Sequence, residues 1–353
     1  MWQARLHDII ARAIEQRIIP GCVIGIVSGD KHSVLPFGHH TYENDSPEAS
    51  KDSVYDVASL TKVIPTSFLA LQLIDRGLLA VEDIVKSYIP ELTLPKADQI
   101  TIWHLLTHTL EHDFQLSACK YMAPEEILAI IFSKPLKSPP GTAFFYSNAS
   151  SILLGIVIER ITGQKLSERA SAEMFIPLEM QNTTFQPDKK FSKVQIVPTE
   201  QDDWRGRLLQ GEVHDESAFI LQRIMTPGSA GLFSTAEDIT HFLKMFLANG
   251  IYQGKQLISA KVIDHMITNQ LASIGKFNGL GIDLFQPYYM GTYAGERTWG
   301  KTGFTGCFFV GDHEKNTAFI MLTNHVHPKR ITDRNVLQNL RIQVSDLILS
   351  STI

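Results

Sequence analysis

The 353-residue chain contains little cysteine, no long hydrophobic run and no concentration of basic charge. Its three cysteines, Cys22, Cys119 and Cys307, are far apart and lack the spacing of metal ligands. We expect them to be small core residues in a reducing compartment and not a disulfide framework. The longest apolar stretches, such as residues 152–158, are too short to span a bilayer, so we expect no membrane span.

The charge balance offers no basic footprint for nucleic acid. The chain has 32 Lys and Arg against 37 Asp and Glu, a formal net charge of -5, and no local run of Lys or Arg. We therefore expect no nucleic-acid partner. Residues 1–17 carry charges throughout and lack the apolar segment of a signal peptide, which predicts a cytoplasmic protein. A periplasmic protein whose signal peptide had been removed would show the same sequence features.

What is present is the composition of a globular protein with a large core, with 44% hydrophobic and 20% charged residues. Apolar and charged positions alternate with a helical period over residues 2–18, and two apolar β-branched runs around a Ser-Gly-Asp turn predict a hairpin. A long helix is predicted over 59–79, with Pro65 as a kink. Further helices are predicted at 235–248, 259–270 and 331–350, and further strands at 280–285, 293–301, 306–311 and 318–323.

Strand patterns therefore lie at both ends of the chain and helical patterns in its middle. The simplest arrangement is an α/β (α+β) fold, in which one antiparallel sheet is built from both chain ends and helices cover its faces. This predicts an α/β region formed by residues 1–79 and 226–353, a mainly helical region over 80–225, and an active site at their junction.

One nucleotide-binding pattern is a coincidence of letters. The segment from Gly295 to Thr302 matches G-x-x-x-x-G-K-[ST]. A working P-loop follows a buried strand and opens a helix whose N-terminus holds the phosphates. Two glycines and a β-rich run follow this match, and they cannot open a helix.

Two other clusters have simpler interpretations than catalysis. His104, His108 and His112 are spaced by four residues, which could place three imidazoles on one helical face. No H-E-x-x-H motif occurs, and a structural histidine pair is favoured, so we expect no metal and no other cofactor. The acidic segment 212–216 lacks any sign that two carboxyls face one glycosidic bond, and local salt bridges explain it.

A serine hydrolase of the Ser-x-x-Lys type has a stronger signal. Serine is a weak nucleophile that needs an adjacent base, and residues i and i+3 share one face of a helix. The pattern occurs four times, and the matches at Ser28, Ser117 and Ser273 fall in turns or loops. Only Ser59 opens a predicted apolar helix, so Ser59 and Lys62 form the candidate pair. No G-x-S-x-G elbow is present, which disfavours an α/β-hydrolase.

Two further motifs complete a set. Tyr146-Ser-Asn148 precedes a predicted helix, and Lys301-Thr-Gly303 occurs once, on a predicted strand. Together with the Ser-x-x-Lys pair, and in this order, they resemble the motifs of the class C β-lactamase and penicillin-binding-protein-like serine hydrolase superfamily. The resemblance covers about residues 20–325 and includes the accessory segments 105–109, 139–142, 231–235 and 322–324.

Two segments refine this resemblance. Residues 196–215 look like a branch of cell-wall-related serine hydrolases. Residues 110–113 read Leu-Glu-His-Asp, where the family usually continues Ser-Gly, and this departure is expected to change one wall of the presumed cleft.

The resemblance implies a β-lactamase/DD-peptidase-like fold and a catalytic set. Ser59 would attack the acyl carbon, while Lys62 and Tyr146 would share the general-base and general-acid work. The enzyme would then be a serine hydrolase working through an acyl-enzyme.

The resemblance also implies substrate-binding residues. Asn148 would bind the substrate amide, and Lys301 and Thr302 would hold a substrate carboxylate beside Gly303. The backbone N–H groups of the nucleophilic serine and of Phe304 would form the oxyanion hole.

The expected substrate is a small molecule or peptide that contains an ester or amide, with a carboxylate near the scissile bond as one option. β-Lactams and D-Ala-D-Ala peptides meet this description, but their targets lie outside the membrane. The predicted location therefore favours esterase-like activity, then D-amino-acid peptidase and then β-lactamase activity. The alternative is a catalytically weak penicillin-binding or sensor protein of the same fold.

Overall fold

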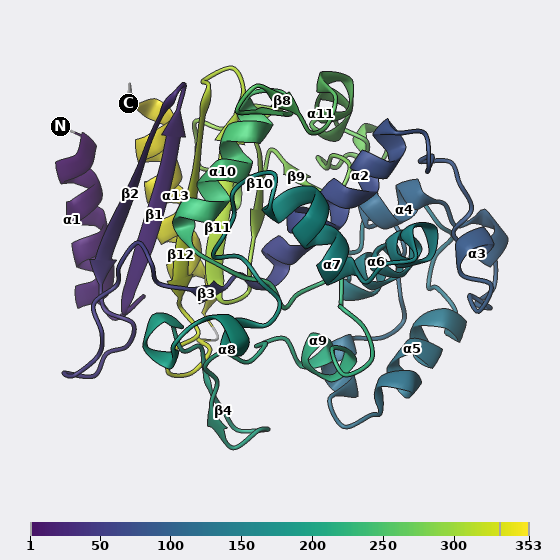
Figure 1. Cartoon of the computed structure of the whole chain (residues 1–353), viewed down its shortest axis with the longest axis horizontal. Coiled ribbons are helices and arrows are strands. Elements are labelled where there is room, and N and C mark those ends of the chain that lie inside the picture. The colour runs from purple at the N-terminus through teal and green to yellow at the C-terminus, as the bar shows by residue number, and fades with distance from the viewer. Residues whose placement is uncertain (1, 332, 352–353) are drawn as a thin grey trace.

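A computed structural model describes residues 2–331 and 333–351, and its centre is one antiparallel sheet flanked by helices (Figure 1). The sheet has six strands in the order β2-β1-β12-β11-β10-β9. Its strands are β1 (Gly21–Ser28), β2 (Lys31–Gly38), β9 (Asp283–Leu284), β10 (Trp299–Thr302), β11 (Gly306–Asp312) and β12 (Thr317–Asn324). Strand β1 pairs with β12 along its length, so the predicted sheet built from both chain ends is confirmed.

The central strands are apolar along their whole length because helices cover both faces of the sheet. Alternate residues of β1 point to opposite sides: Ile24 and Ile26 pack with α1 (Trp2–Glu15) and α13 (Arg334–Ser350). Val23 and Val27 belong to the cluster that contains α10 (Ala236–Leu247). Figure 1 shows α10 in front of the sheet, α13 partly hidden behind its strands, and α1 at the left beside β2.

Two predicted strands are shorter in the structure. β9 has two residues and pairs with only the first half of β10. Residues 293–298 form a turn instead of continuing the strand, because Thr298 bonds back to Gly295 through both its backbone N–H (3.0 Å) and its hydroxyl (2.8 Å). The prediction of a strand over 293–301 was therefore wrong for its first half.

The middle of the chain is mainly helical, as the sequence indicates. Its helices are α3 (Val85–Tyr88), α4 (Ile102–Thr107), α5 (Pro124–Ser133), α6 (Asn148–Thr162), α7 (Leu166–Ala170), α8 (Pro187–Lys190) and α9 (Glu216–Leu221). Later helices are α11 (Ala260–Met266) and α12 (Pro287–Met290). Three short strand pairs are β3 (Tyr55–Asp56) with β6 (Phe233–Ser234), β4 (Gln201–Asp202) with β5 (Arg207–Leu208), and β7 (Ile251–Tyr252) with β8 (Lys255–Gln256).

One hydrophobic cluster runs from the sheet into the helical middle, including Val23, Phe68, Leu153 and Phe246. The division of the chain into two regions stays a prediction. All three cysteines are buried and unpaired by disulfides, which confirms their interpretation as core residues. None of the helices in the described part of the chain is long and apolar enough to cross a membrane.

The segment after Ser59 is not the single long helix that its apolar pattern predicts. It consists of a 3₁₀ turn (Ala58–Lys62), a π-type turn (Val63–Ser67) and α2 (Phe68–Asp75). Ile64 has non-helical dihedral angles, with φ -114° and ψ 98°. The cause is Pro65, which lacks an N–H donor and disfavours helical geometry in the residue before it.

Candidate active site

The predicted nucleophile lies in a strained turn. Ser59 follows Ala58, whose φ of 47° lies in the left-handed region that non-glycine residues rarely adopt. Such a residue costs of order 1–3 kcal/mol and persists only where its surroundings hold it. The buried Asp56 provides part of that support, since its Oδ1 accepts a hydrogen bond of 2.8 Å from the Ala58 N–H. Burial raises the pKa of this carboxyl group.

Lys62 lies directly beside this serine. Residues i and i+3 eclipse each other in a 3₁₀ turn, so the buried ammonium group of Lys62 reaches the Ser59 hydroxyl at 3.0 Å. It also donates to Asn148 Oδ1 and to the Ser229 carbonyl, each at 2.8 Å. All three of its donors are therefore satisfied, and its position is fixed.

Asn148 is oriented by an aspartate far along the chain. It is the first residue of α6, and its amide donates to Asp215 Oδ2 at 2.9 Å and to Ser217 at 3.3 Å. These two bonds direct the amide oxygen toward Lys62. Burial opposes ionisation of Asp215, but the hydrogen bonds it accepts, with those from Ser217 and Ala218 first among them, leave its pKa lowered.

Asp215 was missed as a site residue by reasoning from spacing, because 67 positions separate it from Asn148. Its sequence signals were its places in the acidic segment 212–216 and in segment 196–215. The salt-bridge interpretation of the acidic segment holds for its other members. Glu212 pairs with Arg205 and Arg207, and Glu216 pairs with Arg330.

Tyr146 faces the same serine from the segment before α6. Its side chain is 42% exposed, and the ammonium nitrogens of Lys301 and Lys62 lie 4.4 and 5.1 Å from its ring centroid. Burial acts to raise the pKa of the Tyr146 phenol, but these two cations and a hydrogen bond with Ser59 lower it overall. The buried His108 ring lies 5.0 Å from the Tyr146 ring, and burial together with the same cations holds the pKa of His108 well below its usual value.

Lys301 is less free than the sequence suggests. Its ammonium group lies 2.8 Å from Asp283 Oδ1, and Tyr289 donates to the other carboxylate oxygen at 3.3 Å. Burial opposes the charged form, but Asp283 and Tyr146 raise the pKa of Lys301. Asp283 was missed in the sequence, because only the pairing of β9 with β10 places it beside Lys301. A turn and a strand follow Lys301, in agreement with the exclusion of a P-loop.

The turn after Thr302 brings Phe304 toward the nucleophile. A Cβ atom on Gly303 would lie 2.6 Å from the Val57 carbonyl, so only glycine permits this close approach. Thr305 donates to the Asp56 carbonyl at 2.8 Å and ties the turn to the same segment. Within the described part of the chain, the Phe304 N–H has no acceptor and is available to a ligand.

These groups surround a cavity of about 600 Å³. The predicted residues that line it are Ser59, Tyr146, Lys301, Thr302, Gly303 and Phe304. Lys62 lies just behind Ser59 and is hydrogen-bonded to it, and Asn148 is hydrogen-bonded to Lys62. Phe144, Tyr288 and Leu337 add apolar walls, and Arg330 and Arg341 add basic groups. The structure thus brings all eight predicted residues together.

The three spaced histidines are not on one helical face. Helix α4 ends at Thr107, and His108 adopts a left-handed conformation with φ 54°. No group of three or more His, Cys, Asp or Glu side chains in the ranges 2–331 and 333–351 is placed to hold a metal ion. Residues 110–113 do not line the cavity, contrary to expectation, and His112 is instead buried.

The sheet built from both chain ends, with a serine–lysine–tyrosine cluster in a cavity beside it, defines a serine hydrolase of the penicillin-binding type. The sequence profile of the Beta-lactamase family matches residues 6–341, and the chain belongs to this family. The resemblance found in the sequence is therefore confirmed, as are the β-lactamase/DD-peptidase-like fold and the enzyme class.

Individual relatives differ in their named activities. A Bacillus subtilis protein named N-acetylmuramyl-L-alanine amidase is 30% identical over 306 residues, which cover 78% of this chain and 68% of the relative. A β-lactamase/D-alanine carboxypeptidase from Pseudomonas syringae aligns with a TM-score of 0.77 and 18% identity, covering 100% of this chain and 99% of the other. EstCE1, a hydrolase with promiscuous acyltransferase activity, aligns with a TM-score of 0.75 and 19% identity, covering 98% of both chains. The two structural matches show the shared fold.

Proposed function

We propose that the protein cleaves an ester or amide through an acyl-enzyme on Ser59. Tyr146 takes the hydroxyl proton as the serine oxygen bonds to the substrate carbonyl carbon, and the Lys62 ammonium group, which donates to that oxygen and lowers the pKa of Tyr146, stabilises the developing negative charge. The N–H groups of Ser59 and Phe304 stabilise the oxyanion. The leaving alcohol or amine takes a proton from Tyr146, and water then releases the acyl group by the reverse route. The observation that carries this proposal is the 3.0 Å contact between Lys62 Nζ and Ser59 Oγ.

The substrate we propose is a small ester, or a short peptide amide, that needs no carboxylate beside the scissile bond. The amidase, carboxypeptidase and hydrolase names of similar proteins support this breadth of substrates. The contact of 2.8 Å between Lys301 and Asp283 supports a substrate without a carboxylate next to the scissile bond, because Asp283 already offsets the charge of Lys301. Asn148, which the sequence assigned to the substrate amide, is engaged by Lys62, Asp215 and Ser217, so we propose that it positions Lys62.

The experiment compares Ser59→Ala with the unchanged protein. p-Nitrophenyl acetate, nitrocefin and a D-alanyl dipeptide are offered, and a fluorophosphonate is followed by mass spectrometry. Loss of turnover of about 10³-fold or more, together with loss of the adduct, is expected. Ser117→Ala removes the serine of another Ser-x-x-Lys pattern and is the matched control.

Two outcomes would count against the proposal. Full activity in a folded Ser59→Ala variant would remove Ser59 as the nucleophile. A lasting acyl adduct on Ser59 without turnover would instead support the penicillin-binding sensor of the same fold.

A further inference from the structure

We propose that Glu200 is a positioning residue of the active site, which holds the Phe304 side chain, and with it the oxyanion donor, through His214 and Arg330. This inference rests on the proposed function. The segment 196–215 that contains Glu200 resembles that of cell-wall-related serine hydrolases, yet the catalytic set leaves Glu200 and His214 without a role.

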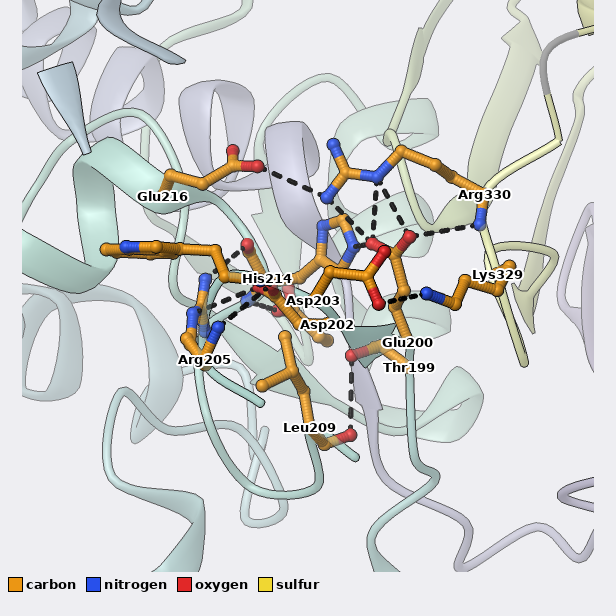
Figure 2. Close-up of polar contacts among 12 residues, drawn as sticks. Thr199, Glu200, Asp202, Asp203, Arg205, Leu209, His214, Glu216, Lys329 and Arg330 are labelled. Atoms are coloured by element: carbon orange, nitrogen blue, oxygen red, sulfur yellow. Dashed lines mark hydrogen bonds and ion pairs between the residues drawn. The ribbon is translucent and has the colours of Figure 1, made fainter. Parts of the chain in front are cut away.

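Glu200 joins two residues from distant parts of the chain (Figure 2). Its Oε2 lies 2.9 Å from His214 Nε2. Arg330 donates to the same carboxylate from Nε at 2.8 and 3.0 Å, from Nη2 at 2.7 Å and from its backbone N–H at 3.1 Å. Glu200 and His214 are both buried, at 4% and 2% exposure, so one desolvated carboxylate fixes both partners.

Both partners contact the Phe304 ring. The His214 ring is stacked on it, with centroids 5.6 Å apart and an interplanar angle of 26°. The Arg330 guanidinium carbon lies 5.4 Å from the centroid of the same ring. Phe304 is 48% exposed and lines the cavity, so packing against the core does not hold its ring. His214 and Arg330 hold it instead, and Glu200 holds them.

The same cluster reaches the nucleophile turn. The backbone N–H of His214 donates to Asp56 Oδ2 at 2.8 Å, and the other oxygen of Asp56 accepts from the backbone N–H of the strained Ala58. The two predicted oxyanion donors, on Ser59 and Phe304, are therefore tied to one histidine. A displacement of this histidine would disturb their spacing, and misplacement by about 1 Å can cost about 10²-fold in rate.

Glu200 keeps its charge throughout the working pH range. Burial opposes ionisation, but hydrogen bonds from His214 and Arg330 lower the pKa of Glu200 to about 2. Among the described residues, loss of this charge by substitution leaves Arg330 with Glu216, at 3.2 Å, as its carboxylate partner. The His214 ring and the Arg330 guanidinium group that contact Phe304 are then no longer held in place.

The test is a double-mutant cycle between Glu200→Gln and Phe304→Ala. For an activated ester, Glu200→Gln is expected to lower kcat about tenfold or more and to change KM less than about twofold. Because Glu200 acts through the Phe304 ring, the same substitution in a Phe304→Ala background is expected to lower kcat less than about twofold further.

A second readout uses the matched thionoester, in which sulfur replaces the carbonyl oxygen. Sulfur is a weaker acceptor, so a displaced oxyanion hole penalises the ester more than the thionoester. The ester-to-thionoester ratio of kcat/KM is expected to fall several-fold in Glu200→Gln. A purely structural defect lowers both rates together. Asp203→Asn is the matched control, because Asp203 is exposed on the same loop and pairs with the exposed Lys329 (Figure 2).

Additive effects in the cycle, or an unchanged ratio in a folded Glu200→Gln variant, would overturn the proposal. If Glu200→Gln does not fold, His214→Phe keeps a ring against Phe304 and is put through the same cycle and ratio. Failure of the proposed function is distinguishable, because Ser59→Ala would then retain ester turnover.

Discussion

At the scale of single residues, the charge state of Tyr146 depends on its cationic neighbours. Burial raises the pKa of its phenol, while Lys301 and Lys62 lower it. Lys301→Gln is therefore predicted to raise the pKa of Tyr146. A general base acts only above its pKa, so the acid limb of the pH profile of kcat/KM should move to higher pH. Lys301→Arg keeps the charge, so the acid limb of its kcat/KM profile should lie closer in pH to that of the unchanged protein. The profile is measured with a neutral ester, and an unmoved limb in Lys301→Gln would contradict this account.

Asp283 is a second residue whose charge is expected to affect activity, through the preference for substrates with or without a free carboxylate. It offsets Lys301 at 2.8 Å and lines the cavity. Asp283→Asn is predicted to raise kcat/KM for a depsipeptide with a free carboxylate about tenfold relative to its methyl ester, because one nearby negative charge is removed. Asp264→Asn, which breaks the exposed pair with Arg297, is the control. An unchanged preference in Asp283→Asn would show that Asp283 does not repel the carboxylate.

At the scale of elements, the turn between β10 and β11 sets the distance between the two halves of the site. Gly303→Ala would place a Cβ atom 2.6 Å from the Val57 carbonyl, so the turn must move away from the nucleophile. We predict a loss of activity of about 10²-fold, measured as kcat. Gly295→Ala adds a Cβ atom with nothing within 4 Å, and it should keep activity. Equal kcat values in the two variants would argue against a precise role for this turn.

Helices, strands and motifs that have a local sequence pattern could be predicted, whereas contacts between distant parts of the chain could not. The strands β1 and β12 and the three motifs could be predicted, because each is encoded by a local pattern. Asp283, Asp215 and Glu200 could not be placed, because each acts on a partner far away in the chain or on an adjacent strand. The segment 59–79 was predicted as one kinked helix, and the non-helical Ile64 before Pro65 divides it more completely than a kink.

At the scale of the whole molecule, the site depends on the entire chain being folded. Ser59, Tyr146 and Lys301 come from the N-terminal part, the middle and the C-terminal part, and one continuous hydrophobic cluster contacts all three parts. Whatever lowers the free energy of unfolding therefore lowers the population of the assembled site. Buried histidines outside the cavity are one such influence, because their protonation is coupled to unfolding.

His112 provides the sharpest case. It is 1% exposed, and neither ring nitrogen has a partner in the described part of the chain. Burial lowers its pKa to about 4 from 6.5, so between these values the unfolded chain binds a proton that the folded chain does not. Its contribution to the free energy of unfolding is therefore complete above about pH 6.5 and is lost as the pH falls toward 4, by about 3 kcal/mol. Burial also lowers the pKa of His40 to about 4, and this histidine acts in the same direction.

Urea unfolding at pH 7.5 and pH 4.5 measures this loss. His112→Leu removes the titrating ring and leaves no unpaired polar atom, so its free energy of unfolding at pH 7.5 should be equal or higher. Its loss between the two pH values should be smaller than that of the unchanged protein by about 2–3 kcal/mol. His7→Leu replaces a histidine on the exposed side of α1 and is the matched control. Equal pH dependence in His112→Leu and the unchanged protein would mean that His112 is already protonated, or exposed, in the folded state.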